Sequence, residues 1–166
     1  IAKTFDRICD VLTHLKYIEG EKTLEQGKIL SKIYAESDLL LTETIKRGVL
    51  NNLSAQELVA VASAMIFQSR TTENYAPKMP HNNVAQALVS IVSIWSELEE
   101  LEERFGVKTQ REPDFGFCYA SYRWSNGHSL TSVLKGTDMT VGDFVRSIKQ
   151  LIDLLTQIGG AAEELR

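Results

Sequence analysis

The sequence has few of the residues from which metal sites and disulfide frameworks are built. Its 166 residues include only two cysteines, three histidines and three prolines. Cys9 and Cys118 belong to no C-x-x-C pair, which favours two buried free thiols over a disulfide or a reactive cysteine. His14, His81 and His128 lie in separate segments, which favours packed or solvated histidines over zinc ligands. We therefore expect no metal site in this chain.

Nucleotide-binding and hydrolase motifs are absent as well. The sequence contains no G-x-x-x-x-G-K-[ST], G-x-G-x-x-G, H-E-x-x-H or G-x-S-x-G pattern. A carboxylate pair such as Glu36 and Asp38 precedes a predicted helix, where helix capping is a commoner role than acid–base chemistry. We therefore expect no catalytic residue and no cofactor here.

Long hydrophobic runs and a strong positive charge are also missing. Apolar segments are interrupted by Ser, Gln or Glu every few residues, and the start lacks the features of a secretory signal, so we expect no membrane span and a cytoplasmic location. The formal net charge of −4 argues against a generic nucleic-acid binder, but a glutamate run from Glu97 to Glu103 concentrates the acidity. A local basic face elsewhere remains possible. Since Ile1 is not an initiator methionine, we expect a processed chain or an excised fragment.

Helical periodicity dominates what is present. Apolar spacing predicts helices over residues 3–16, 29–36, 39–48, 55–69, 84–105, 117–125, 129–134 and 141–158. Ser37 and Asp38 suit a helix N-cap, and Ser54 with Glu57 forms a capping box. Residues 17–28, with Gly20 at a turn, predict a small hairpin. The sequence therefore predicts a mainly α protein, a helical bundle of seven or eight helices with a small N-terminal β-hairpin.

Residues 140–158, TVGDFVRSIKQLIDLLTQI, are the most regular segment. Thr140 and Asp143 predict the N-terminal cap of this helix, and Gly159-Gly160 predicts its end. Its expected inward face consists of Val141, Phe144, Val145, Ile148, Leu151, Ile152, Leu155 and Ile158. The opposite edge carries Arg146, Lys149, Gln150 and Asp153. These four side chains either form a solvated face with i, i+4 pairs or contact a ligand.

An aromatic segment, FGFCYASYRW, ends at Trp124. Phe117, Ala120, Ser121 and Trp124 share a helical face, which is typical of core packing. Stacking of Trp124 on nucleic-acid bases is the other interpretation.

Three segments together resemble a known domain. KILSKIYAESDLLLTETIKRGVLNNLSAQELVAVASAMIFQSR, PDFGFCYASYRWSNGHSLTSVL and TVGDFVRSIKQLIDLLTQI follow one another in the sequence. In this order they resemble the C-terminal helical (DSHCT) domain of superkiller-type DExH-box RNA helicases, with GDFVR similar to the actinobacterial members. The resemblance covers roughly residues 24–158.

This resemblance implies a parent protein with two RecA-like motor domains that use ATP and Mg, a winged-helix domain and this helical bundle. Residues 1–36 would be the tail of the winged-helix domain, and residues 37–166 the DSHCT domain. By similarity, helix 141–158 is the ratchet helix beside a translocating RNA strand. Gln150 and Asp153 match the positions of a basic and an acidic residue, one turn apart, that touch RNA in eukaryotic relatives. Arg146, Lys149 and Trp124 are candidate RNA-binding residues because of their own chemistry. At position 150 this chain has Gln where eukaryotic relatives have a basic residue. The resemblance therefore gives less support for a charge-based RNA contact there.

The partners implied are single-stranded RNA, or DNA, and the upstream domains of the same polypeptide. The alternative is a stand-alone helical adaptor that binds protein through the loop at residues 70–83 or through the glutamate-rich helix. This loop contains Pro77, Pro80 and Asn82-Asn83, which are typical of a partner-contacting excursion.

Overall fold

The computed structural model describes residues 1–70, 77–80 and 82–166, and within them it has eight α-helices and one two-stranded antiparallel sheet. The elements are α1 (Ala2–His14), β1 (Ile18–Glu19), β2 (Lys22–Thr23), α2 (Glu25–Leu30), α3 (Asp38–Lys46), α4 (Ala55–Ser63), α5 (Asn82–Phe105), α6 (Cys118–Ser125), α7 (Leu130–Leu134) and α8 (Val141–Glu163). The predicted fold class is therefore confirmed, including the hairpin, in which Ile18 lies opposite Thr23. None of these helices is long and apolar enough to cross a membrane.

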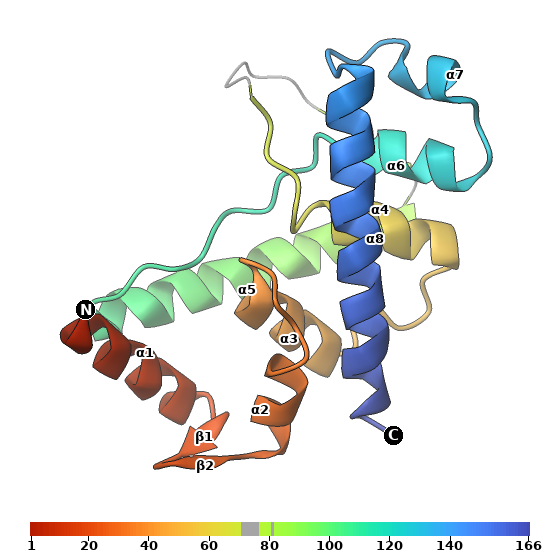
Figure 1. Ribbon diagram of the computed structural model, residues 1–166. Helices are drawn as coiled ribbons and strands as arrows, with labels where there is room; N and C mark the ends of the chain where they lie inside the picture. Colours follow the sequence, from red (N-terminus) through yellow and green to blue (C-terminus); the bar gives the residue numbers. More distant parts are fainter. Residues whose placement is uncertain (71–76, 81) are drawn as a thin grey trace.

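Two long helices organise the molecule. In Figure 1, α5 runs across the structure, with α1 at one end, while α8 stands steeply against the other end beside α6 and α7. Arg7 on α1 donates a hydrogen bond to the Gly106 carbonyl just after α5, and the rings of His14 and Phe105 pack edge to face. α4 contacts α5, α6 and α8 and so joins the two long helices.

The buried core extends through both regions. Its largest fully buried side chains include Tyr17, Phe117, Leu40, Leu41, Met65, Leu88, Ile91, Leu98, Leu151 and Leu154. Cys118 belongs to this core, whereas Cys9 on α1 is only half-buried, and both are free thiols. Burial raises the pKa of the Cys118 thiol to about 12, so its reactive thiolate form is suppressed at neutral pH.

Local capping signals predict helix starts well. Ser54 accepts a hydrogen bond from the Glu57 amide at 3.2 Å, and Thr140 accepts one from the Asp143 amide at 3.1 Å. Ser37, however, makes no side-chain cap: its hydroxyl instead donates to the Met65 carbonyl, 28 residues away. Ser37 thus holds the predicted N-cap position of α3, but its hydroxyl bonds a tertiary partner instead of capping the helix.

Three predicted helix positions also differ from the structure. The helix expected over residues 29–36 lies at Glu25–Leu30 instead, and residues 31–36 are not helical. α4 ends at Ser63 rather than near Ser69, because the next carbonyls bond to distant groups: that of Ala64 accepts from the Asp114 amide and that of Met65 from Arg111. α8 continues through Gly159-Gly160 to Glu163.

The glutamate run is not uniformly solvated. Glu102 is 3% exposed, and its carboxylate accepts hydrogen bonds from the Thr109 amide and hydroxyl and from both nitrogen groups of Gln110. It therefore fixes the chain that leaves α5. The other four glutamates of the run lie at exposed or half-exposed positions, where Glu97 pairs with Arg47 and Glu99 with Lys108.

A buried charge connects the hairpin region to α3. Glu43 is 4% exposed and accepts hydrogen bonds from the Tyr17 hydroxyl, from Lys46 at 2.8 Å and from Arg47 at 3.1 Å. Burial alone would raise the pKa of Glu43, but these three donors outweigh it and the pKa is lowered. Burial and the neighbouring carboxylate raise the pKa of Tyr17, which therefore remains a donor.

We expect Glu43→Gln to lower the free energy of unfolding at neutral pH by roughly 1–3 kcal/mol, because Lys46 and Arg47 lose the buried negative charge and one of its two acceptor oxygens becomes a donor. Since the folded-state pKa of Glu43 is depressed, its contribution is present above the unfolded-state value, near 4.5, and is lost as pH falls through the folded-state pKa. Urea unfolding at several pH values should therefore show a weaker loss of stability in acid for the variant. Glu100→Gln, at an exposed position, is the control. It should change neither the free energy of unfolding at neutral pH nor its loss in acid. An unchanged pH profile for Glu43→Gln would contradict this account.

A second prediction concerns the glycines inside α8. A Cβ at Gly159 would meet no atom within 4 Å, so Gly159→Ala should raise the free energy of unfolding by about 0.5–1 kcal/mol. Gly27→Ala is the opposing control, because its Cβ would lie 2.4 Å from the Tyr17 carbonyl oxygen and should destabilise the protein. Chemical unfolding measures both changes. A loss of stability in Gly159→Ala would mean that the helix does not continue through this position.

Candidate nucleic-acid interface

α8 presents one buried face and one outward face. Its buried residues are Phe144, Ile148, Leu151, Leu154, Ile158 and Ala161, which recur every three or four positions. The outward face carries the predicted polar edge: Arg146, Lys149, Gln150 and Asp153 are all exposed. The structure thus brings four of the five candidate residues together on one helix surface.

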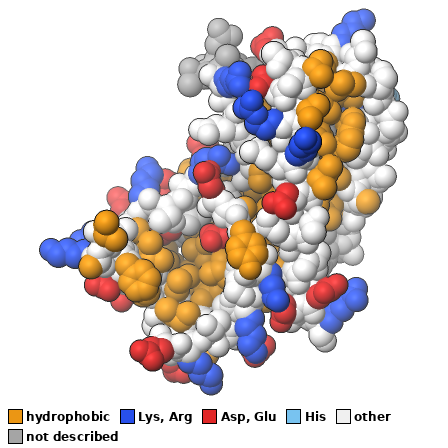
Figure 2. Space-filling view, in the orientation of Figure 1, with side chains coloured by type: hydrophobic (Ala, Val, Ile, Leu, Met, Phe, Trp, Pro, Cys, Tyr) orange, Lys and Arg blue, Asp and Glu red, His pale blue; other side chains and the backbone are white. Residues whose placement is uncertain are grey.

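Three apolar residues expected in the core are exposed instead. Val141 is 54% exposed, Val145 42% and Ile152 51%, whereas Leu155 is half-buried against the core. At about 100° per residue, the apolar positions of α8 cover an arc wider than one contact face, so part of that arc must remain outside. We call Val141, Val145 and Ile152 the apolar stripe of α8. Figure 2 shows apolar side chains along the upper part of α8 with basic side chains beside them.

Trp124, the fifth candidate, lies next to α8. Its ring packs edge to face against Phe144, with centroids 6.3 Å apart, and 38% of the residue remains exposed. Phe144 in turn packs edge to face on Phe117, which stacks on Phe67. Trp124 is therefore both a packing residue and a surface aromatic, so both interpretations of it retain physical support.

The polar edge is only partly occupied by internal partners. Asp153 accepts a hydrogen bond from Gln157 at 2.9 Å, rather than pairing with Lys149 as the i, i+4 spacing suggested. Within the described part of the chain, Arg146, Lys149 and Gln150 make no side-chain hydrogen bond or ion pair. Their donors are therefore available to a ligand.

Both ends of α8 are held by distant segments. Near the C-terminal end, the Gln157 side chain accepts a hydrogen bond from the Tyr34 amide at 2.6 Å. At the N-terminal end, Arg70 donates to the Asp143 carboxylate at 2.8 Å. The hydrogen bond from Thr140 is the largest cause that lowers the pKa of Asp143, followed by the charges of Arg70 and Arg146, so this carboxylate stays ionised. Sequence periodicity gave no signal for Arg70, because its partner lies 73 residues away.

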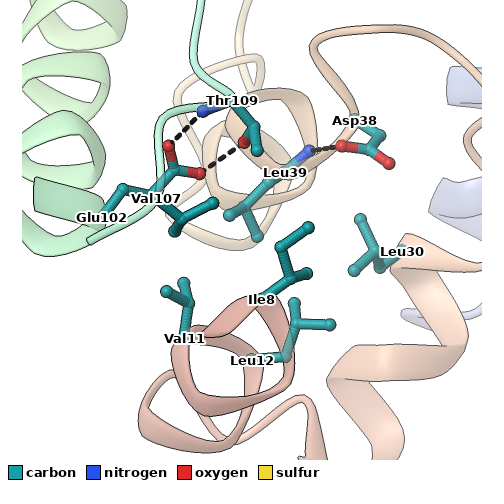
Figure 3. Close-up of a pocket in the computed structure, with 9 residues that line it drawn as sticks. All are labelled: Ile8, Val11, Leu12, Leu30, Asp38, Leu39, Glu102, Val107 and Thr109. Carbon is teal, nitrogen blue, oxygen red and sulfur yellow. Dashed lines mark hydrogen bonds between the residues drawn. The ribbon is translucent and has the colours of Figure 1, made fainter. Parts of the chain in front are cut away.

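A separate hollow lies at the far end of α5. Figure 3 shows its lining of aliphatic side chains from α1, α2, α3 and the segment after α5, together with Asp38 and Glu102. Its volume is about 110 Å³, and burial raises the pKa of Asp38, whose carboxylate accepts a hydrogen bond from the Leu39 amide. No candidate RNA-binding residue lines this hollow. The described residues also contain no group of three or more His, Cys, Asp or Glu placed to hold a metal ion.

Comparisons with known proteins agree with the resemblance seen in the motifs. The chain is 33% identical over 177 residues to a probable helicase HelY of Mycobacterium tuberculosis, an alignment that covers 98% of this chain and 20% of the relative. It is 34% identical over 179 residues to the HelY of Mycobacterium leprae, covering 99% of the chain and 20% of that protein. The chain is 27% identical over 162 residues to the human exosome RNA helicase MTR4, and the alignment covers 93% of the chain and 15% of that protein. The chain thus spans about a fifth or less of the length of these relatives.

A family model matches most of the chain. The match to the DSHCT (NUC185) domain covers residues 20–166, which include the hairpin turn, the helices from α2 onwards and the whole polar edge of α8. Together with a mainly helical fold, this match shows that the chain belongs to the DSHCT domain family.

Proposed function

We propose that this domain is an accessory module of an ATP-dependent RNA helicase and that it guides single-stranded RNA past the motor domains. The observation that carries the proposal is the outward face of α8, where exposed polar side chains, three of them without a side-chain partner among the described residues, lie beside exposed apolar ones. Trp124 extends this surface from α6. The described residues 1–36 include the helix and hairpin that we assign to the end of a winged-helix domain.

The chemistry of this face suits a single strand. Unpaired RNA exposes base planes and base edges, which proteins contact with apolar or aromatic side chains and with hydrogen-bonding groups. Val145, Ile152 and Trp124 offer the first kind of contact. Gln150 and Asp153 offer the second, while Arg146 and Lys149 can reach phosphate oxygens. Gln150 can contact a base edge without a charge.

The enzymatic activity would reside in the rest of the polypeptide. The relatives are named as helicases, and MTR4 as an RNA helicase, while the aligned region is a small fraction of each. We therefore assign ATP and Mg to RecA-like domains upstream of this chain, whose own sequence offers no phosphate-binding loop. Those domains and the winged-helix domain would be the intramolecular partners of this module.

The alternative of a protein-binding adaptor draws less support from the structure. Glu102 of the glutamate-rich helix is buried, and Glu97 is paired with Arg47. The other proposed contact, the loop at residues 70–83, falls largely on residues 71–76 and 81, outside the described residues. Salt distinguishes the two functions, because affinity for a single strand falls with log salt by about 0.7 per phosphate contacted, whereas an apolar protein interface responds little.

We expect the triple substitution Arg146→Ala, Gln150→Ala and Asp153→Ala in the full-length protein to lower the rate of RNA duplex unwinding. Loss of about 1.4 kcal/mol of contact energy across the three positions corresponds to about a tenfold loss of RNA affinity. All three side chains are exposed, so thermal unfolding of the variant should match that of the parent. Unwinding of a duplex with a single-stranded tail and RNA affinity are the measurements.

A control of the same composition is available on α5. Gln86→Ala, Glu103→Ala and Arg104→Ala also remove one amide, one acid and one arginine from exposed helix positions, and this variant should unwind normally. Normal unwinding and RNA affinity in the α8 variant would refute the guiding role. Equal losses in both variants would point to a general charge effect instead.

A further inference from the structure

An arginine from outside α8 is fixed at the first turn of this helix. Arg70 lies on the segment after α4, and its Nη2 donates to Oδ1 of Asp143 at 2.8 Å. The Thr140 hydroxyl donates to the other carboxylate oxygen, Oδ2, at 2.9 Å. Both oxygens of Asp143 are therefore engaged, and the carboxylate holds the guanidinium in one place.

Arg70 retains most of its binding capacity in this position. A guanidinium has five N–H donors, and among the described residues the structure gives one hydrogen bond from that of Arg70. Its side chain is 73% exposed. An exposed ion pair of this kind contributes little to stability. The arrangement thus presents a pre-positioned cation with donors directed outward.

Arg146 supplies a second cation at the same place. It follows Asp143 by three residues on α8, which puts the two side chains on neighbouring turns of one helix surface. Arg146 is exposed and makes no hydrogen bond or ion pair within the described ranges. Two arginines therefore flank one carboxylate, and the cluster carries a net positive charge in an acidic chain.

The outward face of α8 consequently has two chemically different sides. At about 100° per residue, the order around the helix is Val145, Lys149, Arg146, Gln150 and Asp143. The apolar stripe therefore lies at one margin and the cluster of Arg70, Asp143 and Arg146 at the other. A single strand has the same two sides, because its bases are apolar planes and its backbone is anionic.

We infer that Arg70 and Arg146 bind phosphate groups of a single strand on α8 and that Asp143 is the positioning residue for Arg70. This inference rests on the proposed function and adds to it a phosphate contact from a residue outside α8. Arginine suits the task, since its planar fork matches phosphate oxygens.

The test measures the affinity of the full-length protein for a fluorescent oligouridine by anisotropy at a series of KCl concentrations. Arg70→Ala should weaken binding and reduce the slope of log affinity against log salt by about 0.7, the value for one phosphate contact in a single strand. Arg70→Lys should keep the slope, because the charge remains. Lys108→Ala is the matched control: it removes an 80% exposed cation that pairs with Glu99 on α5, and neither affinity nor slope should change.

Asp143→Asn tests the positioning role separately. This substitution removes a negative charge, so electrostatics alone predicts tighter binding of the oligouridine. If Asp143 acts by holding Arg70, binding should weaken instead, with the salt slope reduced as in Arg70→Ala. Tighter binding would overturn the positioning role, and thermal unfolding of the variant confirms that Asn still caps α8.

The outcomes separate this inference from the proposed function. If Arg70→Ala behaves like Lys108→Ala while the Arg146, Gln150 and Asp153 variant binds weakly, the phosphate contact of Arg70 is refuted and the guiding role stands. If both variants bind normally, both ideas fail. A smaller slope of log affinity against log salt in Arg70→Lys would show that charge is not the basis of the contact.

Discussion

The packing of Phe144 against Phe117 determines which side of α8 faces outward. The two ring centroids are 5.7 Å apart, and Phe117 is itself stacked on Phe67 at 5.2 Å, so a column of aromatic rings fixes the rotation of the helix. The apolar residues of α8 alone would allow several rotations, because they cover a wide arc. With Phe144 seated in the column, Val145 and Ile152 are left outside, beside the polar edge. The candidate interface is thus a consequence of core packing.

Hydrogen bonds tie both ends of α8 to distant segments. Tyr34 donates its amide to Gln157 at one end of α8, and Arg70 pairs with Asp143 at the other. Gln157 also donates to Asp153, so a candidate contact residue is oriented by the same support. Side chains that are already ordered lose less conformational entropy when a ligand binds. A surface with few cations can therefore still offer a defined contact.

Local signals in the sequence predicted the helices, the hairpin and the caps at Ser54 and Thr140, because each depends on neighbours within a few residues. The polar edge of α8 was predicted for the same reason. Features that depend on nonlocal partners were not predicted. The Ser37 hydroxyl donates to the Met65 carbonyl, and Glu102 is buried beneath the segment with Thr109 and Gln110 that donates to it. The exposure of Val145 depends on a ring contact with a different helix. Such contacts leave no periodic pattern in the sequence, so the exposure of the apolar stripe of α8 was not predicted.

The composition of the α8 face bears on what a guide must do. A strand that moves relative to the protein has to break each contact at every step, so tight contacts would oppose movement. Phosphate contacts lose affinity in salt, whereas stacking contacts accept any base at moderate energy. A face with two arginines at one margin, a short apolar stripe at the other and a neutral Gln150 between acidic and basic neighbours would limit the affinity for each nucleotide. On this argument, the low positive charge that disfavours a tight nucleic-acid binder is compatible with a surface over which a strand passes.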